Sequence, residues 1–530
     1  MVKKFACYLI ILLSAGSLLA QSSTLSVDLR TRFQTLDGFG AHQSGSSLDQ
    51  GWWNQLFFED MDCSIFRVDM TPVLTAPYSD LSYYSPWFMG SQVRSVFNLE
   101  DPANPNGPEN NRVRTYTGPN DYGRTFGGRS APIAIMGPDL NRNISLFRYQ
   151  SNQAMRKIAS DQMSGIPRTL TGSIWSPLPW VKVSSGNRYN QNWWPGPVQN
   201  TPWPFIWGGN FAGGRLDVSG TPLQVFNDSQ AGGSGPTSAL TQFARSTAAY
   251  IAGFQRFHNV KFYAVSIQNE LNFEQFYNSA TYPLSSQYLT AVKAVKAEFA
   301  KHSELRDIKI MGPEDLLGGD AYGLWEYGGP IHKNLQYLQN IDRDPEASRA
   351  VDFFCVHGYA PDGVSSAGSD PRQWTWWANG WPGSPAPGIP SNVKGFKSYG
   401  KKSWMTETSG EHPDWIFPKS GFPGQGAFSI AVKIHQALTA GEESAWIYWT
   451  FADTDANGNV SDQGLTSQAL GANSPKYVAA KHFFKFIRPG ARLVKSNLNA
   501  PTGVYASSYY SESDRSLVQV IINATASQQS

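Results

Sequence analysis

The sequence predicts a closed barrel of eight parallel β-strands with a small β-structure beside it. Three observations support this fold class. Short β-rich runs alternate with helical stretches over residues 36–486, eight such runs can be identified, and after residue 490 the pattern changes to short strands and turns. Alternating strands and helices are typical of parallel sheets, and eight strands can close into a (β/α)8 barrel, the TIM barrel.

The eight expected barrel strands are short, rich in β-branched and aromatic residues, and bounded by glycine, proline or polar residues. They cover residues 36–40, 64–70, 169–176, 262–268, 308–312, 351–357, 403–406 and 445–450. Between several of them, apolar residues recur every three or four positions, which predicts amphipathic helices. The clearest of these helices cover residues 238–258, 285–302 and 427–440.

Two segments after the second and third strands are unusually long. Residues 71–142 and 177–236 are rich in Gly, Pro, Asn, Tyr and Trp and show no sustained period. Loops of this length in a compact domain are usually functional or disordered, and the tryptophans argue against disorder. Loops that follow barrel strands lie on the catalytic face. We therefore expect these two segments to form the walls of a binding cleft.

The first 20 residues have the features of a secretory signal peptide. Lys3 and Lys4 precede a short apolar run, and small residues lead to a cleavage position after Ala20. The run is shorter than the roughly 20 apolar residues that span a bilayer. We therefore expect a secreted protein, extracellular or periplasmic, with no membrane insertion after the signal is removed.

The expected domain organisation follows from these patterns. Residues 1–20 form the signal peptide and residues 34–488 the barrel. Residues 24–33 and three later runs, 491–497, 502–509 and 516–523, predict strands outside the barrel. We expect residues 24–33 and 489–530 to make the side β-structure together.

Charge and cysteine content exclude several classes of partner. Removal of two lysines with the signal leaves 43 − 2 = 41 basic residues against 41 acidic ones. This balance gives no electrostatic reason to expect nucleic acid or an anionic membrane as a partner. Cys63 and Cys355 remain in apolar runs, where we expect buried free thiols, although their pairing is undecided. The oligomeric state leaves no signature in the sequence.

Aromatic residues are abundant in a chain with few charges. The 18 Trp, 23 Tyr and 30 Phe occur in a sequence that is only 16% charged. Flat rings with a polar edge suit the apolar faces of sugars, but they also fill ordinary cores. Composition alone therefore leaves carbohydrate binding open.

Two glutamates stand at the ends of expected strands. Glu270 follows the strand at 262–268 and Glu407 follows the strand at 403–406. They are 407 − 270 = 137 residues apart, but opposite strands of one barrel bring their ends to a shared mouth. Cleavage of a glycosidic bond requires one carboxylic acid and one carboxylate, held about 5 Å apart in a retaining enzyme. A single such glutamate could be a surface residue or a helix cap, whereas the pair predicts a site.

These residues also carry a resemblance to a known family. Asn269-Glu270 after a strand, together with Trp404-Met-Thr-Glu407, resembles clan A glycosidases and in particular glycoside hydrolase family 30. The further matching segments fall in family order over roughly residues 30–495. They are Leu36-Asp-Gly-Phe-Gly40, Ser173-Ile-Trp-Ser-Pro-Leu-Pro-Trp180, His357-Gly-Tyr359, Trp446-Ile-Tyr-Trp449 and Phe486-Ile-Arg-Pro-Gly490.

The resemblance implies a retaining β-glycoside hydrolase that needs no metal or other cofactor. Glu270 would be the general acid/base and Glu407 the nucleophile. Asn269 would hydrogen-bond the sugar 2-hydroxyl, a contact that strengthens in the transition state. Tyr359 would donate a hydrogen bond to Glu407, and Arg67 would help to keep that carboxylate ionised. Arg67 could instead be a structural ion-pair partner.

The resemblance further implies that three tryptophans line the sugar subsites, namely Trp175, Trp180 and Trp449. Trp446 and Trp449 cannot both point inward from a regular strand, and Trp449 lies nearer the mouth. Strict alternation along its strand points Trp404 away from Glu407, so we expect Trp404 between barrel and helices.

Two further polar residues lie near the expected mouth. His357 belongs either to the site or only to a hydrogen-bond network of its neighbours, and we include it among the supporting residues. Glu314 is a third carboxylate after the fifth strand, for which we expect a supporting role. Asp453 to Asn459 resembles the start of a calcium loop, but Gly464 stands where a bidentate Glu is required, so a polar turn is expected.

Rival functions leave different signatures. A metal-dependent barrel hydrolase needs clustered His and Asp ligands, and the His after the first strand, His42, has no second His two residues away. A non-catalytic carbohydrate-binding barrel would typically have lost one carboxylate, and both are present. The resemblance also covers exo-acting, glucosylceramidase-like members of the family, which place an Asp in the loop several residues after the strand-two Arg to bind the terminal sugar. Here Asp69 comes too early and no other Asp occurs before Asp80.

The expected substrate is therefore a β-linked oligo- or polysaccharide of the xylan or β-1,6-glucan or galactan type, cleaved by an endo mode. Glucuronoxylan-specific members of the family use an Arg after strand eight, and residues 451–474 contain none. The resemblance also implies a barrel with a fuller β-sandwich beside it than residues 489–530 can form. The side structure is therefore either truncated or reduced.

Overall fold

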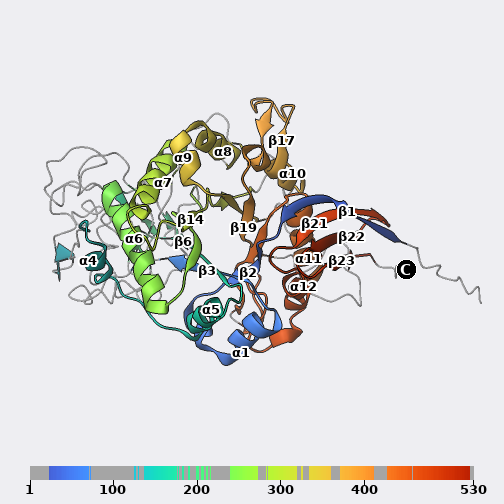
Figure 1. Ribbon diagram of the computed structural model, residues 1–530, viewed down its shortest axis with the longest axis horizontal. Coiled ribbons are helices and arrows are strands. Elements are labelled where there is room, and N and C mark those ends of the chain that lie inside the picture. The colour runs from blue at the N-terminus through green and yellow to red at the C-terminus, as the bar shows by residue number, and fades with distance from the viewer. Residues whose placement is uncertain are drawn as a thin grey trace, which may run out of the picture.

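In the computed structural model, a parallel sheet curls around the centre of the molecule (Figure 1). The structure describes residues 23–70, 136–175, 239–271, 284–318, 334–359, 370–410, 426–455 and 457–525, with a few isolated residues and short hairpin strands between 125 and 216. Around the sheet the strands are β14 (Lys309–Ile310), β13 (Phe262–Ser266), β6 (Thr169–Ile174), β3 (Ile65–Met70), β2 (Gly38–His42), β20 (Ala445–Tyr448), β19 (Ser403–Glu407), β16 (Phe354–His357) and β15 (Asp315–Leu316).

The sheet closes through its two shortest members, β14 and β15, which are two halves of one interrupted strand. Pro313 between them has no N–H and so cannot continue the ladder. On one side the Met311 N–H donates to the carbonyl of Val265 at 3.0 Å, and on the other the Gly312 N–H donates to that of Phe353 at 3.2 Å. The predicted (β/α)8 barrel is therefore confirmed, and the eight expected strands form it.

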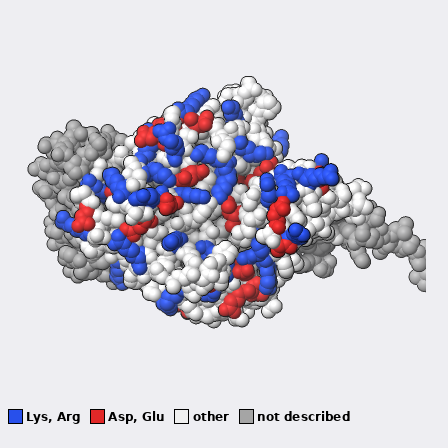
Figure 2. Space-filling model, viewed as in Figure 1, with Lys and Arg blue, Asp and Glu red and all other residues white. Residues whose placement is uncertain are grey.

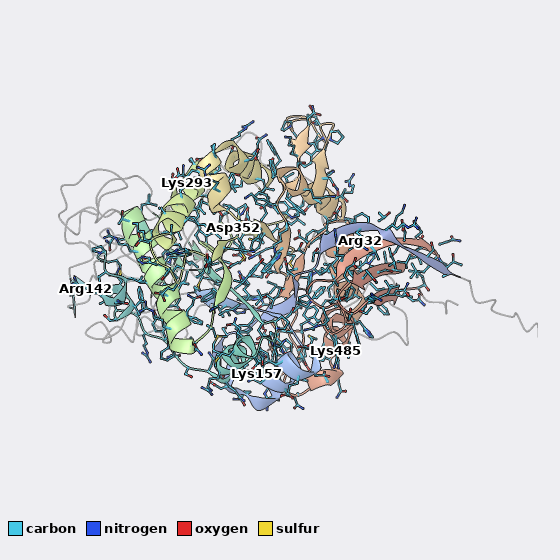
Figure 3. The ribbon with its side chains drawn as sticks, viewed as in Figure 1. Arg32, Arg142, Lys157, Lys293, Asp352 and Lys485 are labelled. Carbon is cyan, nitrogen blue, oxygen red and sulfur yellow. The ribbon has the colours of Figure 1, made fainter. Side chains whose placement is uncertain are left out.

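Helices surround the barrel (Figure 1). They are α1 (Gly51–Asn54), α4 (Leu140–Ile144), α5 (Gln153–Met163), α6 (Ala239–His258), α7 (Ser285–Phe299), α8 (Asn334–Arg343), α9 (Pro345–Ala350), α10 (Arg372–Asn379), α11 (Ala427–Thr439) and α12 (Pro475–Phe484). The three helices expected most clearly are α6, α7 and α11, and each differs from its predicted bounds by three residues or fewer. The labelled side chains of Arg142, Lys157 and Lys293 belong to outer helices (Figure 3).

An antiparallel sheet of four strands lies beside the barrel. Its order is β1 (Thr24–Thr35), β21 (Arg492–Asn499), β22 (Val504–Ser511) and β23 (Ser516–Asn523). The first described strand thus pairs with the last part of the chain, and Figure 1 shows β1 beside β21. Against this sheet packs α11, whose His435 ring lies 5.5 Å from that of Tyr505. The predicted side β-structure is confirmed.

The lower interior of the barrel is an apolar layer to which Trp404 belongs. Its buried members come from six of the barrel strands and are Ile65, Ala264, Met311, Phe353, Cys355, Trp404, Ala445 and Ile447. The expectation that Trp404 lies between barrel and helices is therefore wrong. The reason is a β-bulge: opposite the single step from Val356 to His357 on β16, strand β19 takes two steps, from Met405 to Glu407. The extra residue, Thr406, lets Trp404 and Glu407 both face inward.

Other expectations concern the surface and the cysteines. Lys and Arg side chains are interspersed with Asp and Glu over the face shown in Figure 2. Cys63 and Cys355 are buried free thiols, as expected. None of the helices that the structure describes is long and apolar enough for a membrane span. The expected signal peptide and nearly all of the two long loops lie outside the described residues.

Candidate active site

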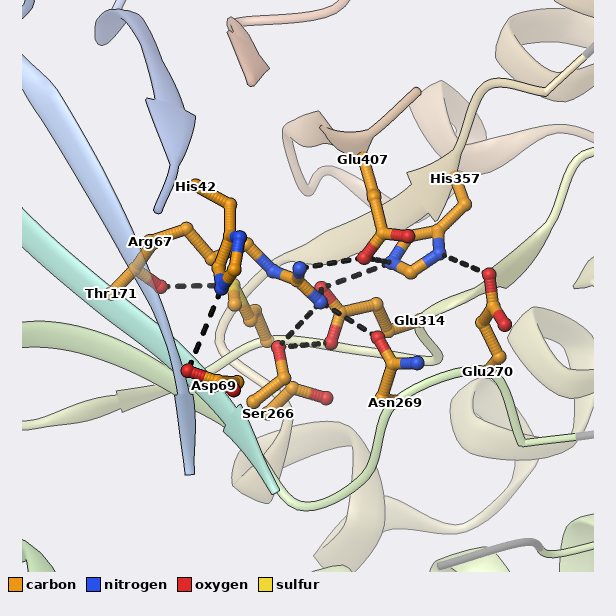
Figure 4. Close-up of polar contacts among 12 residues, drawn as sticks. His42, Arg67, Asp69, Thr171, Ser266, Asn269, Glu270, Glu314, His357 and Glu407 are labelled. Carbon is orange, nitrogen blue, oxygen red and sulfur yellow. Dashed lines mark hydrogen bonds and ion pairs between the residues drawn. The ribbon is translucent and has the colours of Figure 1, made fainter. Parts of the chain in front are cut away.

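The two glutamates meet at the C-terminal mouth of the barrel (Figure 4). Glu407 ends β19, and Glu270 lies four residues after β13. One carboxylate oxygen of each lies within 4.8 Å of the other. Both side chains are buried, with residue exposures of 5% for Glu270 and 4% for Glu407. The parallel strands therefore bring two carboxyl groups, distant in sequence, to within reach of a single sugar.

Two strong donors hold Glu407. Arg67 in β3 donates from Nη1 to Oε2 at 2.6 Å, and the Tyr359 hydroxyl, two residues after β16, donates to Oε1 at 2.6 Å. Both bonds have an ionised partner, and such bonds are short and about twice as strong as neutral ones. Glu407 is therefore fixed in orientation from two sides. Both donors are residues that the resemblance assigned to this carboxylate.

Glu270 lies in a different environment. Its backbone has φ of 42°, in the left-handed region that costs a non-glycine residue about 1–3 kcal/mol and is frequent at functional sites. Burial raises the pKa of its carboxyl group, and the charge of Glu407 raises it further. His357 opposes this shift, because its Nδ1 lies 2.9 Å from Oε1 of Glu270. The net effect of these neighbours and of burial is a raised pKa at Glu270.

His357 joins Glu270 to the third carboxylate. Its Nε2 lies 3.3 Å from Oε1 of Glu314 and 3.8 Å from Oε2 of Glu407. Burial alone would lower the pKa of His357, but the three carboxylates, Glu407 first, raise it to about 10. At neutral pH the ring is therefore an imidazolium between carboxyl groups. The structure thus places His357 among the three carboxyl groups at the barrel mouth.

Glu314 is fully buried and lies next to Nε2 of His357. It forms an ion pair with Nη2 of Arg67 at 3.2 Å and accepts a short hydrogen bond from the hydroxyl of Ser173. Burial would raise the pKa of its carboxyl group, but Arg67 and His357 outweigh burial and lower the pKa to about 2. Glu314 is therefore a permanent negative charge within the barrel.

Arg67 lies at the centre of the network (Figure 4). Besides Glu407 and Glu314, its guanidinium contacts Oδ1 of Asn269 at 2.7 Å and Oγ of Ser173 at 3.2 Å. Burial opposes its charged form, but the carboxylates of Glu314 and Glu407 raise its pKa above the usual value. Because the Asn269 oxygen accepts from Arg67, the amide nitrogen turns to the opposite side, where it can meet a sugar hydroxyl.

Aromatic rings form a stack at the mouth. The Trp449 ring stacks on His42, with ring centroids 3.8 Å apart, and on Trp175, with centroids 5.0 Å apart, and it is nearly parallel to both. Trp446 instead packs outward against Phe484 of α12. The choice of Trp449 as the inward residue agrees with this placement.

Trp180 lies outside the described residues. Its expected place in a sugar subsite therefore stays a prediction.

Sequence reasoning missed two residues of the site. Ser173 was within a matched segment, and polar residues at alternate positions of β6 (Thr171, Ser173) could have indicated an inward polar face. His42 had been considered only as a metal ligand. Its Nε2 lies 3.5 Å from Oδ1 of Asp69, and burial lowers its pKa, so it supports Trp449 as a neutral ring.

A metal ion was not expected, and the chemistry of the cluster argues against one. Donor atoms of Glu270, His357 and Glu407 lie within 4.8 Å of one another, close enough to share a cation. However, both nitrogens of His357 face carboxylates, and Arg67 already neutralises Glu407. A metal would have to displace a proton from His357.

The calcium-like segment after strand eight is a turn. Backbone amides of Asn457 and Asn459 donate to Oδ1 of Asp455 at 2.8 and 2.9 Å. Asp455 thus accepts hydrogen bonds from its own turn, as expected for a polar turn.

Comparison with known proteins gives distant relatives. No protein-family model matches the chain. It is similar to glucuronoxylanase XynC of Bacillus subtilis, with 26% identity over 195 residues, which cover 36% of this chain and 37% of that protein. The same enzyme from strain 168 is 24% identical over 199 residues, again 36% and 37% of the two chains. The match thus spans little more than a third of the curated relatives.

Solved structures match over nearly the whole chain. A glycoside hydrolase family 30 subfamily 8 xylanase from Clostridium acetobutylicum has a TM-score of 0.50 and 17% identity, covering 94% of this chain and 84% of its own. The endo-β-1,6-glucanase BT3312 has a TM-score of 0.55 and 16% identity, with 95% and 87% covered. A conserved exported protein from Bacteroides fragilis has a TM-score of 0.54 and 13% identity, with 94% and 89% covered. At these identities the likeness establishes the fold.

Proposed function

We propose that this chain is a retaining β-glycoside hydrolase of glycoside hydrolase family 30 that cleaves a β-linked polysaccharide within the polymer. The observation that carries the proposal is the pair of buried carboxyl groups with oxygens within 4.8 Å at the barrel mouth. Retaining enzymes hold such a pair about 5 Å apart, whereas inverting enzymes need roughly 6.5–9.5 Å. The sequence likeness to a glucuronoxylanase and the family 30 structural neighbours support the family assignment.

In the first step Glu407 attacks the anomeric carbon from one side of the sugar. Arg67 and Tyr359 orient the attacking carboxylate through two bonds of 2.6 Å. Glu270 gives its proton to the departing glycosidic oxygen, for which a raised pKa suits it. The C–O bond to the leaving sugar breaks, and an ester between Glu407 and the sugar forms.

In the second step water hydrolyses the ester between Glu407 and the sugar. Glu270, now ionised, takes a proton from the water, whose oxygen attacks the anomeric carbon and releases Glu407. Two inversions give overall retention. Asn269, anchored by Arg67, would hold the 2-hydroxyl, and the stack of His42, Trp449 and Trp175 would offer a flat wall to the sugar.

The polymer we propose is a xylan or a β-1,6-linked glucan or galactan. Similar proteins are named glucuronoxylanase and endo-β-1,6-glucanase. Because residues 451–474 contain no Arg, we expect no strict requirement for glucuronate. An exo mode would release only monosaccharide, and a substrate panel separates the two modes.

We also propose export of the protein and the division of the chain into three parts. Residues 1–20 would be a signal peptide, and a structural neighbour from Bacteroides fragilis is named an exported protein. The barrel would take residues 34–488, with residues 24–33 and 489–530 as the side structure. Sequencing of the N-terminus of the secreted form tests the cleavage after Ala20.

A mechanism-based inhibitor tests the catalytic assignment. A 2-deoxy-2-fluoroglycosyl fluoride of the sugar that the enzyme releases should esterify Glu407, and peptide mapping locates the label. The variant Glu407→Gln should take no label. Glu443→Gln, which changes a fully buried glutamate among Trp377 and Ser403, is the matched control and should be labelled normally. A label on any other residue contradicts the assignment.

The panel of polymers tests mode and stereochemistry together. Products from xylan, β-1,6-glucan and β-1,6-galactan are sized, and their first-formed anomer is read by NMR. Oligosaccharides with the β-anomer are expected. The α-anomer as first product, or monosaccharide alone from every polymer, would refute the retaining or the endo part of the proposal.

A further inference from the structure

Glu314 is a buried carboxylate that the proposed reaction leaves without a part. It follows Pro313 in the interrupted fifth strand and has no solvent exposure. Its neighbours are the guanidinium of Arg67 at 3.2 Å, the imidazole of His357 at 3.3 Å and the hydroxyl of Ser173. It lies on the far side of His357 from Glu270, so it acts on the reacting groups through others (Figure 4).

The arrangement of His357 depends on both carboxyl groups. Its Nδ1 faces Oε1 of Glu270 at 2.9 Å, and its Nε2 faces Oε1 of Glu314 at 3.3 Å. A neutral imidazole carries one N–H, so one ring nitrogen would point a lone pair at a carboxyl oxygen. Only the imidazolium offers a donor on each side. The negative charge of Glu314, 3.3 Å from Nε2, is therefore what makes the doubly protonated ring the favourable form.

The charges of the network balance in one state. Two cations, Arg67 and His357, face the carboxyl groups of Glu270, Glu314 and Glu407. With Glu270 protonated, two positive charges meet two negative ones. Buried charges need such partners, because an unpaired one is costly to desolvate. Ionisation of Glu270 would leave a surplus negative charge.

Other titratable groups around Glu314 do not alter this balance. Burial raises the pKa of Tyr288 on α7, of Cys355 on β16 and of Tyr359, so these stay neutral. Asp315 adds repulsion to Glu270, in the same direction as Glu407 but weaker. Asp69 lies beside His42, on the other side of Arg67.

We propose that Glu314 is a positioning residue that keeps His357 doubly protonated, so that Nδ1 donates to Glu270. The negative charge of Glu314 at the same time offsets the charge of the imidazolium, so that Glu270 can keep the proton required of the acid. This role rests on the function proposed above. Glu314 touches neither sugar nor leaving group. It acts through His357 on one side and, with Ser173, fixes the guanidinium that orients Glu407 on the other.

The test compares Glu314→Gln with Glu314→Asp and with Glu443→Gln. Loss of the charge at position 314 should let the proton shared by His357 and Glu270 leave at lower pH. The upper pKa of the kcat/KM profile on the cleaved polymer should then fall by about one unit or more in Glu314→Gln. Glu314→Asp keeps the charge and should keep the upper pKa while losing rate. Glu443→Gln, equally buried but outside the network, should keep both.

A second measurement separates this inference from the proposed function, since it needs no substrate. In protein labelled with 15N-histidine, the His357 resonances, identified by their loss in His357→Gln, should show an imidazolium in wild type at pH 8 and titration at lower pH in Glu314→Gln. A neutral His357 in folded wild type at pH 7 would overturn the inference. So would an upper pKa that is the same in Glu314→Gln and wild type. Wild type that cleaves no polymer but shows the imidazolium would refute the function alone.

Discussion

Replacement of His357 by Gln should move the upper limb of the pH–rate profile to higher pH. In the structure, Nδ1 of His357 lies 2.9 Å from Oε1 of Glu270 and lowers the pKa of that carboxyl group against the effect of burial. The amide of Gln can still donate a hydrogen bond but carries no charge. Glu270 then keeps its proton to higher pH, because burial and Glu407 act without opposition.

The size of the shift is bounded by the geometry. Two unit charges at the observed 2.9 Å interact by roughly 6 kcal/mol when the effective dielectric constant is about 20. One pKa unit corresponds to about 1.36 kcal/mol, so roughly four units is the ceiling. Water that fills the space of the lost ring would return part of this, and single neighbours typically shift a pKa by about 1–3 units. We expect a rise of about 1–2 units.

The assay is kcat/KM on the cleaved polymer from pH 4 to 10, for wild type and His357→Gln. Thermal melting at pH 6 checks that the variant is folded. The shift should be opposite in sign to that of Glu314→Gln, although the two residues are neighbours at 3.3 Å. A general loosening of the site would move both variants in the same direction. An unchanged or lower upper pKa in His357→Gln would refute the electrostatic reasoning.

Two further substitutions probe single contacts. Tyr359→Phe removes the 2.6 Å hydrogen bond to Glu407, a bond to a charged group worth about 1.5–3 kcal/mol. If most of that is lost from the transition state, kcat/KM should fall about 10- to 100-fold in a variant that thermal melting shows to be folded at the assay temperature. A fall below twofold would exclude a role in the rate. Burial raises the pKa of Glu443 well above its usual value despite donors from Ser403 and Trp377, so its contribution to stability is complete below the unfolded pKa near 4.5 and declines as the pH rises. Glu443→Gln should therefore gain in melting temperature relative to wild type between pH 4 and pH 8, by about 2 °C or more, and an equal difference at both pH values would contradict this.

Most of the fold follows from local patterns in the sequence. Apolar residues recur with the period of a strand or a helix over short stretches of sequence. All eight barrel strands and helices such as α6 and α11 were therefore predictable close to their bounds. Glu270 and Glu407 stand at the ends of expected strands, so their meeting at one mouth then followed from barrel geometry. What the family resemblance added was the contacts of Glu407 with Arg67 and Tyr359.

The line of groups from Glu270 through His357 to Glu314 was beyond sequence reasoning. Each residue could be assigned to the mouth, because each follows or ends a strand. Which nitrogen of His357 faces which carboxylate depends on side-chain directions that differ by a few ångströms, and no spacing in the sequence encodes them. The charge state of His357 depends in turn on those distances, so neither its pKa nor its two carboxylate partners were predictable.

The error over Trp404 shows what the sequence could not indicate about the catalytic strand. Around the barrel, inward positions alternate from an apolar layer to the mouth, as from Ile65 to Arg67, from Cys355 to His357 and from Ile447 to Trp449. On β19 the same passage, from Trp404 to Glu407, takes three residues, because Thr406 is inserted at the bulge. A regular strand would have to turn one of the two side chains outward. The bulge thus lets a large indole fill the barrel and a carboxylate face the sugar from the same strand, and it re-aims the side chain on which catalysis would depend.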